Sequence, residues 1–100
     1  MCIRDRDYLE VRPEMREKIE KYIREDRLHV GPWYTLPEEF NVSGESIVRN
    51  LMMGNKLSEQ YGKVTKTGYS PFSYGQNSQM AQIYRGFDID TILFLSLIHI

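Results

Sequence analysis

Three helical patterns alternate with three short apolar runs along this chain, and this alternation constrains its fold more than any other feature. Apolar residues recur at helical spacing in stretches that follow Pro13, Ser43 and Ser78. The short runs cover residues 28–30, 64–69 and 91–94. The order helix, strand, helix, strand, helix, strand is typical of crossover units in a parallel sheet. The sequence therefore predicts an α/β fold built on parallel strands.

Local signals predict where the helices begin and end. Pro13 suits a first helical turn, because its missing N–H would have no partner there. Ser43 is expected to cap the second helix, with Gly62 at its end, and Ser78 is expected to cap the third. The second helix should bury one apolar stripe, which consists of Ile47, Val48, Leu51, Met52, Leu57 and Tyr61.

The two ends of the chain are related to each other. Residues 1–6 and 95–100 can be back-translated into reverse-complementary DNA strings, which is typical of the transposon ends used as sequencing adapters. We therefore expect both flanks to be adapter artefacts and residues 7–94 to be the biological segment. Parallel sheets need cover on both faces and neighbours at their edges. The segment is thus expected to be an incomplete piece, whose partner is the remainder of its own domain.

Charge and hydropathy argue against two classes of partner. The formal net charge is -1 at pH 7, with 13 basic and 14 acidic residues. A chain of this balance has no basic patch to neutralise phosphates, so no nucleic-acid partner is expected. The apolar tail of residues 91–100 is too short to span a bilayer, so no membrane partner is expected.

The loop after the first predicted strand carries aromatic and acidic side chains together, from Gly31 to Phe40. In parallel sheets, function gathers in the loops that follow the carboxyl ends of strands. Aromatic rings stack on the CH faces of sugars and carboxylates accept from sugar hydroxyls, so Trp33, Glu38 and Glu39 are candidates for a sugar site. Two alternatives stay open: the aromatic side chains could anchor the loop to the core, and the carboxylates could be solvated.

The loop after the second predicted strand resembles that of a known family. Its residues 68–87, which begin Gly68-Tyr69-Ser70-Pro71-Phe72, resemble the nucleophile loop of glycoside hydrolase family 38. That family contains α-mannosidases and mannosylglycerate hydrolases, and residues 31–51 resemble its bacterial branch. Two long motifs in the right order are a specific signal, and the resemblance covers essentially all of residues 7–94.

The resemblance implies a fold, a reaction and a cofactor. The fold would be a modified parallel β/α barrel, and this chain would be a fragment of its amino-terminal catalytic domain. The reaction would be hydrolysis of α-mannosides with retention, which needs a carboxylate nucleophile and a second, acid/base carboxyl. Zinc or another divalent metal would grip the sugar hydroxyls and be ligated partly by the nucleophile. A cytoplasmic location follows from the same resemblance.

Carried over position by position, the family pattern expects the nucleophilic Asp at position 72, where this chain has Phe72. Phenylalanine can neither attack a sugar nor bind zinc, and the family's other metal ligands would lie upstream and downstream. No catalytic residue and no metal ligand is therefore assigned. Tyr74 occupies a site-lining aromatic position, so the predicted substrate-binding residues are Trp33, Glu39 and Tyr74. His29, within an apolar run, is expected in the core rather than at a metal.

Two functional hypotheses follow, and both have a carbohydrate partner. In the first, the parent protein is an α-mannosidase-like hydrolase, and this chain alone is inactive. In the second, the parent is a sugar-binding homologue that has lost catalysis, because Phe72 occupies the nucleophile position.

Overall fold

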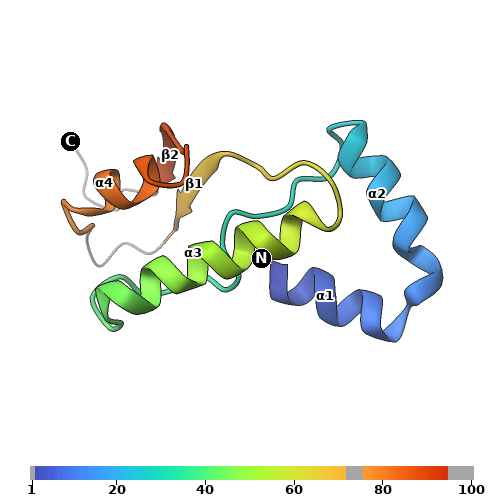
Figure 1. Cartoon of the computed structure of the whole chain (residues 1–100), viewed down its shortest axis with the longest axis horizontal. Helices are drawn as coiled ribbons and strands as arrows, with labels where there is room; N and C mark the ends of the chain where they lie inside the picture. Colours follow the sequence, from blue (N-terminus) through green and yellow to red (C-terminus); the bar gives the residue numbers. More distant parts are fainter. Residues whose placement is uncertain (1, 72–75, 95–100) are drawn as a thin grey trace.

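The computed structural model describes residues 2–71 and 76–94. In chain order the elements are α1 (Cys2–Val11), the 3-10 turn η1 (Pro13–Met15), α2 (Arg16–Arg24), α3 (Gly44–Glu59), β1 (Thr67–Ser70), α4 (Met80–Arg85) and β2 (Thr91–Phe94). The molecule is elongated, with extents of 44 × 29 × 23 Å. Helix α3 crosses its middle, with α1 and α2 toward one end and β1, β2 and α4 toward the other (Figure 1).

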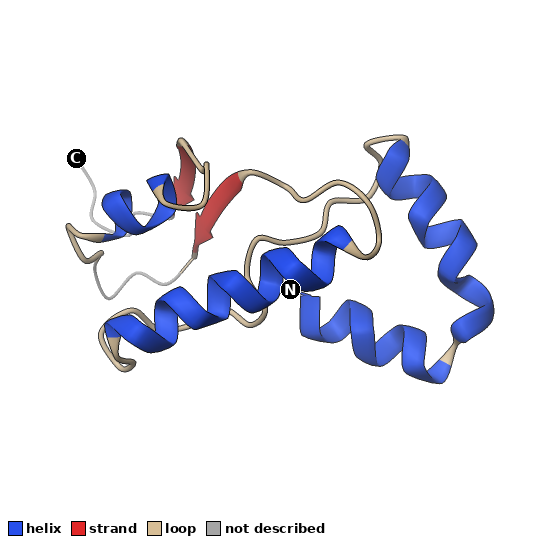
Figure 2. Cartoon of the chain, in the orientation of Figure 1, coloured by secondary structure: helices blue, strands red, loops and turns tan. Residues whose placement is uncertain are grey.

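The strands are parallel, as predicted. β1 pairs with β2 in a register that runs from Thr67 opposite Thr91 to Ser70 opposite Phe94, and α4 forms the crossover between them. Figure 2 shows the two strands side by side, with α4 next to them. The α/β class with parallel strands is thus confirmed, whereas the barrel stays a prediction.

Two predicted strand boundaries were wrong. Of residues 28–30, only Val30 pairs, through a single parallel bridge to Val64. The Thr65 amide donates to Val30 O at 2.9 Å. The chain then turns away at Gly31, whose φ of +85° favours glycine. The regular part of the second predicted strand accordingly begins at Thr67 rather than at Val64.

Capping at α3 follows the sequence prediction. Ser43 is extended and its Oγ accepts from the Ser46 amide at 3.2 Å, which confirms the predicted N-cap. Ser78 does not cap α4, so that prediction was wrong. Asn77 takes over the turn instead: its Oδ1 accepts from the Gln79 amide at 2.9 Å and its carbonyl accepts from the Met80 amide at 3.0 Å.

Helix α1 was not predicted, because it begins inside residues 1–6, which the sequence predicts to be an adapter end. Its first turn is held by tertiary contacts: the amides of Cys2 and Ile3 donate to the carbonyls of Trp33 and Tyr34, both at 3.1 Å. These bonds satisfy donors that a free helix end would leave without partners. The assignment of residues 1–6 and 95–100 to adapter sequence stays a prediction.

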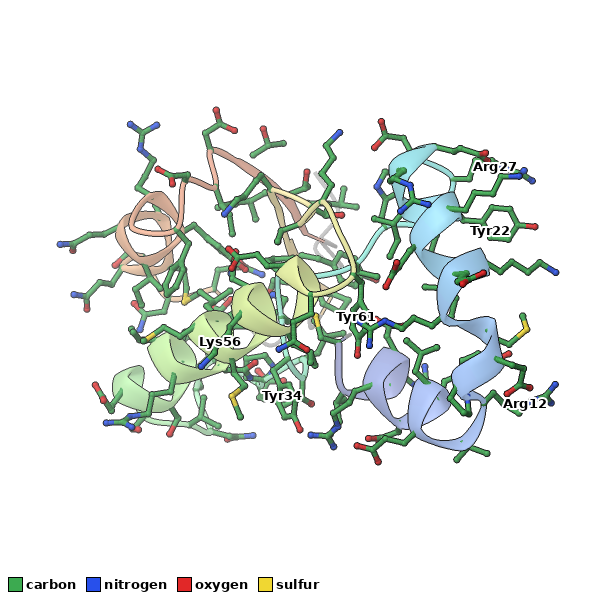
Figure 3. The ribbon with its side chains drawn as sticks, turned by 45° about the vertical axis from the view of Figure 1, so that its right-hand side comes forward. Arg12, Tyr22, Arg27, Tyr34, Lys56 and Tyr61 are labelled. Atoms are coloured by element: carbon green, nitrogen blue, oxygen red, sulfur yellow. The ribbon has the colours of Figure 1, made fainter. Side chains whose placement is uncertain are left out.

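The core divides into two clusters joined by α3. The larger contains Trp33, Ile47, Leu51, Met80, Tyr84 and Ile89, and the smaller contains Ile23, Val30 and Tyr61. Near the smaller one, the Arg16 guanidinium lies 5.5 Å from the centre of the Tyr61 ring, and Figure 3 shows Tyr61 between α3 and the α1–α2 end. None of the helices within residues 2–71 and 76–94 is long and apolar enough to cross a bilayer.

The buried face of α3 differs from the predicted stripe. Met52 is 57% exposed, so its assignment to the core was wrong. The buried face passes instead through Gly54, Asn55 and Ser58. Small and polar residues occupy it because the backbone of residues 32–34 crosses the helix at Gly54, too close for a side chain there.

Candidate functional site

The two candidate loops follow the carboxyl ends of neighbouring parallel segments and contact each other. The first loop follows Val30 and leads to α3, and the second follows β1 and leads to α4. Glu39 joins them: Oε1 accepts from Ser70 Oγ at 3.0 Å and Oε2 accepts from the Asn77 amide at 2.8 Å. Gln76 Nε2 also donates to Ser70 Oγ at 3.1 Å. We call this set of contacts the Glu39 bridge.

Trp33 anchors the first loop in the core. Its side chain is 3% exposed, and its ring packs edge to face on Tyr84, with centroids 5.8 Å apart. Its indole Nε1 donates to Tyr69 O at 3.0 Å, so it also ties the loop to β1. The anchoring alternative therefore describes Trp33 well, and contact with a sugar stays a prediction for this residue.

Glu39 is 5% exposed, and both of its oxygens are used inside the protein. The solvated alternative was therefore wrong for Glu39. Its role as a substrate-binding residue stays a prediction. Phe72 and Tyr74 lie outside the described residues.

Two neighbours of Glu39 behave differently from it. Glu38 is half-buried, and its Oε1 is buried without a hydrogen-bond partner among the described atoms. Phe40 is 60% exposed, so it does not anchor the loop to the core as the alternative suggested. The Glu39 side chain is thus buried in the protein, and the neighbouring Phe40 side chain is exposed to solvent.

Tyr84 lies behind the two loops and was predicted only as part of a helical stripe. Burial, with the nearby negative charge of Glu39 as a smaller cause, raises the pKa of Tyr84 to about 12. A Cβ at Gly68 would lie 2.9 Å from the Tyr84 ring, so the bare backbone of β1 makes room for this side chain. The phenol is therefore neutral at physiological pH and packs between β1 and the first loop.

A second polar residue, Asn50 of α3, fixes the first loop from the other side. Its Oδ1 accepts from the amides of Tyr34 and Thr35 at 3.0 and 3.1 Å, and its Nδ2 donates to Thr35 O at 2.7 Å. Sequence reasoning missed Asn50, Ser70 and Asn77, because their partners lie 15 to 38 residues away along the chain. No short spacing pattern signals such contacts.

A groove of about 860 Å³ runs along α3 and is lined by Tyr34, Glu45, Arg49, Asn50, Met52, Met53, Asn55, Lys56, Glu59 and Phe87. Figure 3 shows Lys56 on α3 and Tyr34 beside that helix. Trp33 and Glu39 do not line it. The groove is thus separate from the predicted sugar-binding side chains that the structure describes.

The described residues do not fit a metal ion by themselves. Within residues 2–71 and 76–94, no three His, Cys, Asp or Glu side chains form a group that could hold one. His29 is exposed, so its assignment to the core was wrong; it lies on the wall of a small hollow with Asp26 and Lys63.

Three comparisons show which known proteins this chain is similar to. Residues 4–99 match the family described as glycosyl hydrolases family 38, N-terminal domain. A protein of Halalkalibacterium halodurans assigned as a mannosylglycerate hydrolase is 44% identical over 78 residues, which are 77% of this chain and 9% of that protein. The crystal structure of an α-mannosidase from Enterococcus faecalis V583 is also similar, with 35% sequence identity and a TM-score of 0.85. The match covers 92% of this chain and 10% of the α-mannosidase chain. The chain spans about a tenth of the length of these relatives.

Proposed function

Because this chain belongs to glycosyl hydrolase family 38, as part of its N-terminal domain, we propose that it is a slice of the active-site region of a retaining α-mannosidase-type hydrolase. The parent protein would hydrolyse an α-mannoside, and its catalytic domain would be a modified parallel β/α barrel. The observation that carries the proposal is the match to the Enterococcus α-mannosidase, because it covers 92% of this chain with a TM-score of 0.85.

The reaction needs more than the described residues supply. Retaining hydrolysis uses one carboxylate as nucleophile and a second carboxyl as acid and base. Phe72 stands at the nucleophile position, and both Glu39 oxygens are engaged by Ser70 and Asn77. We therefore propose that this chain alone does not hydrolyse mannosides, and that the parent's metal, zinc or another divalent ion, is held by residues outside it.

What this chain contributes is the arrangement of two loops. Trp33 and Asn50 hold the first loop on α3 and β1, and Glu39 holds the second loop against the first. Loops that are fixed in this way keep reacting groups in place without rearrangement at the moment of reaction.

A sugar-binding homologue is the second candidate, and Phe72 is the observation that favours it. A protein of this kind would keep the loops and bind a mannoside without cleaving it. Binding and hydrolysis can be measured separately, so the two candidates make different predictions.

The test is hydrolysis of an aryl α-mannoside and of mannosylglycerate by the full-length protein with zinc, before and after Phe72→Asp. The hydrolase proposal expects turnover by the unchanged protein. Activity that appears only in Phe72→Asp identifies a lost nucleophile and favours the binding homologue, and no turnover by either protein, with mannoside binding retained, refutes the hydrolase proposal. Phe40→Asp is the matched control: it places the same new carboxylate on the first loop, at a residue that is 60% exposed, and should not create activity.

A further inference from the structure

Glu39 is a buried carboxylate, and the unfavourable free energy of removing it from water must be offset by contacts around it. It is 5% exposed, and no ion pair joins it to a basic side chain in the described part of the chain. A buried charge without a counter-ion is destabilising unless hydrogen bonds satisfy it. Here both oxygens accept from neutral donors, the Ser70 hydroxyl and the Asn77 amide.

The two donors lie at the two ends of one loop. Ser70 is the last residue of β1, and Asn77 begins the turn that leads into α4. One side chain from the first loop therefore holds both ends of the second loop. Gln76 adds a further contact between the two ends of this loop, because its Nε2 donates to Ser70 Oγ.

A carboxylate of this length accepts directly from both donors. Glutamine has the same shape, but it can keep the Asn77 contact only by turning its Nε2 toward Ser70 Oγ, which already accepts from Gln76 Nε2. Aspartate offers two acceptors on a shorter stem. The use of a charged side chain in a buried place, where a neutral one of equal size would cost less, indicates a positional role.

We propose that Glu39 is a positioning residue, which sets the separation of Ser70 and Asn77, the described residues at the two ends of the β1–α4 loop. This inference rests on the proposed function, in which position 72 of that loop is where the nucleophile of an active homologue stands. Glu39 acts on the reaction through the ends of the loop and does not touch the reacting atoms.

The first arm of the test measures amide hydrogen exchange in the full-length protein. In Glu39→Ala, which removes both acceptors, the Asn77 amide should exchange at least tenfold faster, while amides in the middle of α3, such as that of Leu51, keep their rates. Unchanged exchange at Asn77 would overturn the proposal. So would equal acceleration at Leu51, because a general loss of stability moves both. Glu59→Ala makes the same change at an exposed position at the end of α3 and should leave Asn77 protected.

The second arm measures steady-state hydrolysis of an aryl α-mannoside by the full-length protein that carries Phe72→Asp. Glu39→Ala should lower kcat at least tenfold with KM changed less than twofold, because substrate still binds while Ser70 and Asn77 are no longer held by one side chain. Ser70→Ala added to Glu39→Ala should lower kcat little further, since both act through one contact. An unchanged kcat would overturn the proposal. If neither the unchanged nor the Phe72→Asp protein hydrolyses the mannoside, the proposed function fails, and the exchange arm alone decides the role of Glu39.

Discussion

Gly54→Ala tests whether helix propensity or close packing decides stability in the middle of α3. In an exposed helix interior, alanine in place of glycine stabilises by about 1 kcal/mol. At position 54, an added Cβ would lie 2.1 Å from Pro32 O, 2.5 Å from Tyr34 N and 2.6 Å from Trp33 C, whereas ordinary contacts begin at 3.4 Å. All three atoms belong to the backbone, so no rotation of a side chain relieves the overlap.

The first loop must therefore move away from α3, and the cost has two parts. Overpacking by itself costs roughly 1–3 kcal/mol. The movement also loosens the Asn50 contacts to the loop, at about 1 kcal/mol for each hydrogen bond, and part of the burial of Trp33. The sum is a loss of about 3–5 kcal/mol in the free energy of unfolding, which outweighs the propensity gain.

Urea unfolding followed by the fluorescence of Trp33, the single tryptophan, measures this loss directly. With a slope of about 1–2 kcal/mol per molar urea, the midpoint should fall by roughly 1.5–5 M, or the cooperative transition should vanish. Gly44→Ala is the control within the same helix: nothing lies within 4 Å of its added Cβ, so stability should change by less than about 0.5 kcal/mol. A Gly54→Ala chain as stable as the original, or an equal loss in Gly44→Ala, would refute the steric reasoning.

Two further predictions use the same unfolding measurement. Asn50→Ala should lower the free energy of unfolding by about 1–3 kcal/mol, because two amides and a carbonyl of the first loop lose their partner; Asn50→Asp keeps the acceptor contacts to Tyr34 and Thr35 and should lose less. For Tyr84, burial and then the charge of Glu39 raise the pKa in the folded chain to about 12, while an unfolded tyrosine ionises near 10. Stability should therefore be independent of Tyr84 below pH 10 and fall by about 2–3 kcal/mol between pH 10 and 12, because the unfolded chain releases the proton first. Tyr84→Phe should lack that part of the fall, and an equal fall in both proteins would contradict the assignment.

The sequence predicted local structure where the signal and its partner are close together. Ser43 caps α3 through an amide three residues away, and the prediction was right. Ser78 offered the same signal, but Asn77 lies one position earlier and its side chain and carbonyl form the turn into α4. Two adjacent residues of good capping type compete, and their identities alone do not decide between them.

The core of α3 could be predicted only in part, for a reason of the same kind. Ile47 and Leu51 are buried as the apolar pattern indicated, but Met52 is exposed and Gly54 is buried. An apolar stripe predicts a buried face when side chains cover that face. Here the backbone of residues 32–34 covers it, and a backbone requires a small residue beneath it rather than a large apolar one.

The candidate site shows most clearly which contacts could not be predicted from the sequence. The resemblance identified the two loops, and the parallel strands brought them together as expected. The sequence could not show how they contact each other, because Glu39 reaches residues 31 and 38 positions later in the chain. Aromatic and acidic composition was compatible with a sugar site and with internal contacts, and the structure shows the internal contacts for Trp33 and Glu39.

These contacts change what the family motifs say about activity. Trp33 and Glu39 hold the loops in place, so a homologue that only binds sugar would need them as much as an enzyme would. Their presence therefore supports the fold of the family without distinguishing catalysis from binding. Position 72 is different, because the resemblance expects the nucleophilic carboxylate there, and phenylalanine cannot act as a nucleophile. The decision between hydrolase and binding homologue thus depends on turnover before and after Phe72→Asp, and no amount of similarity in the supporting residues can replace that measurement.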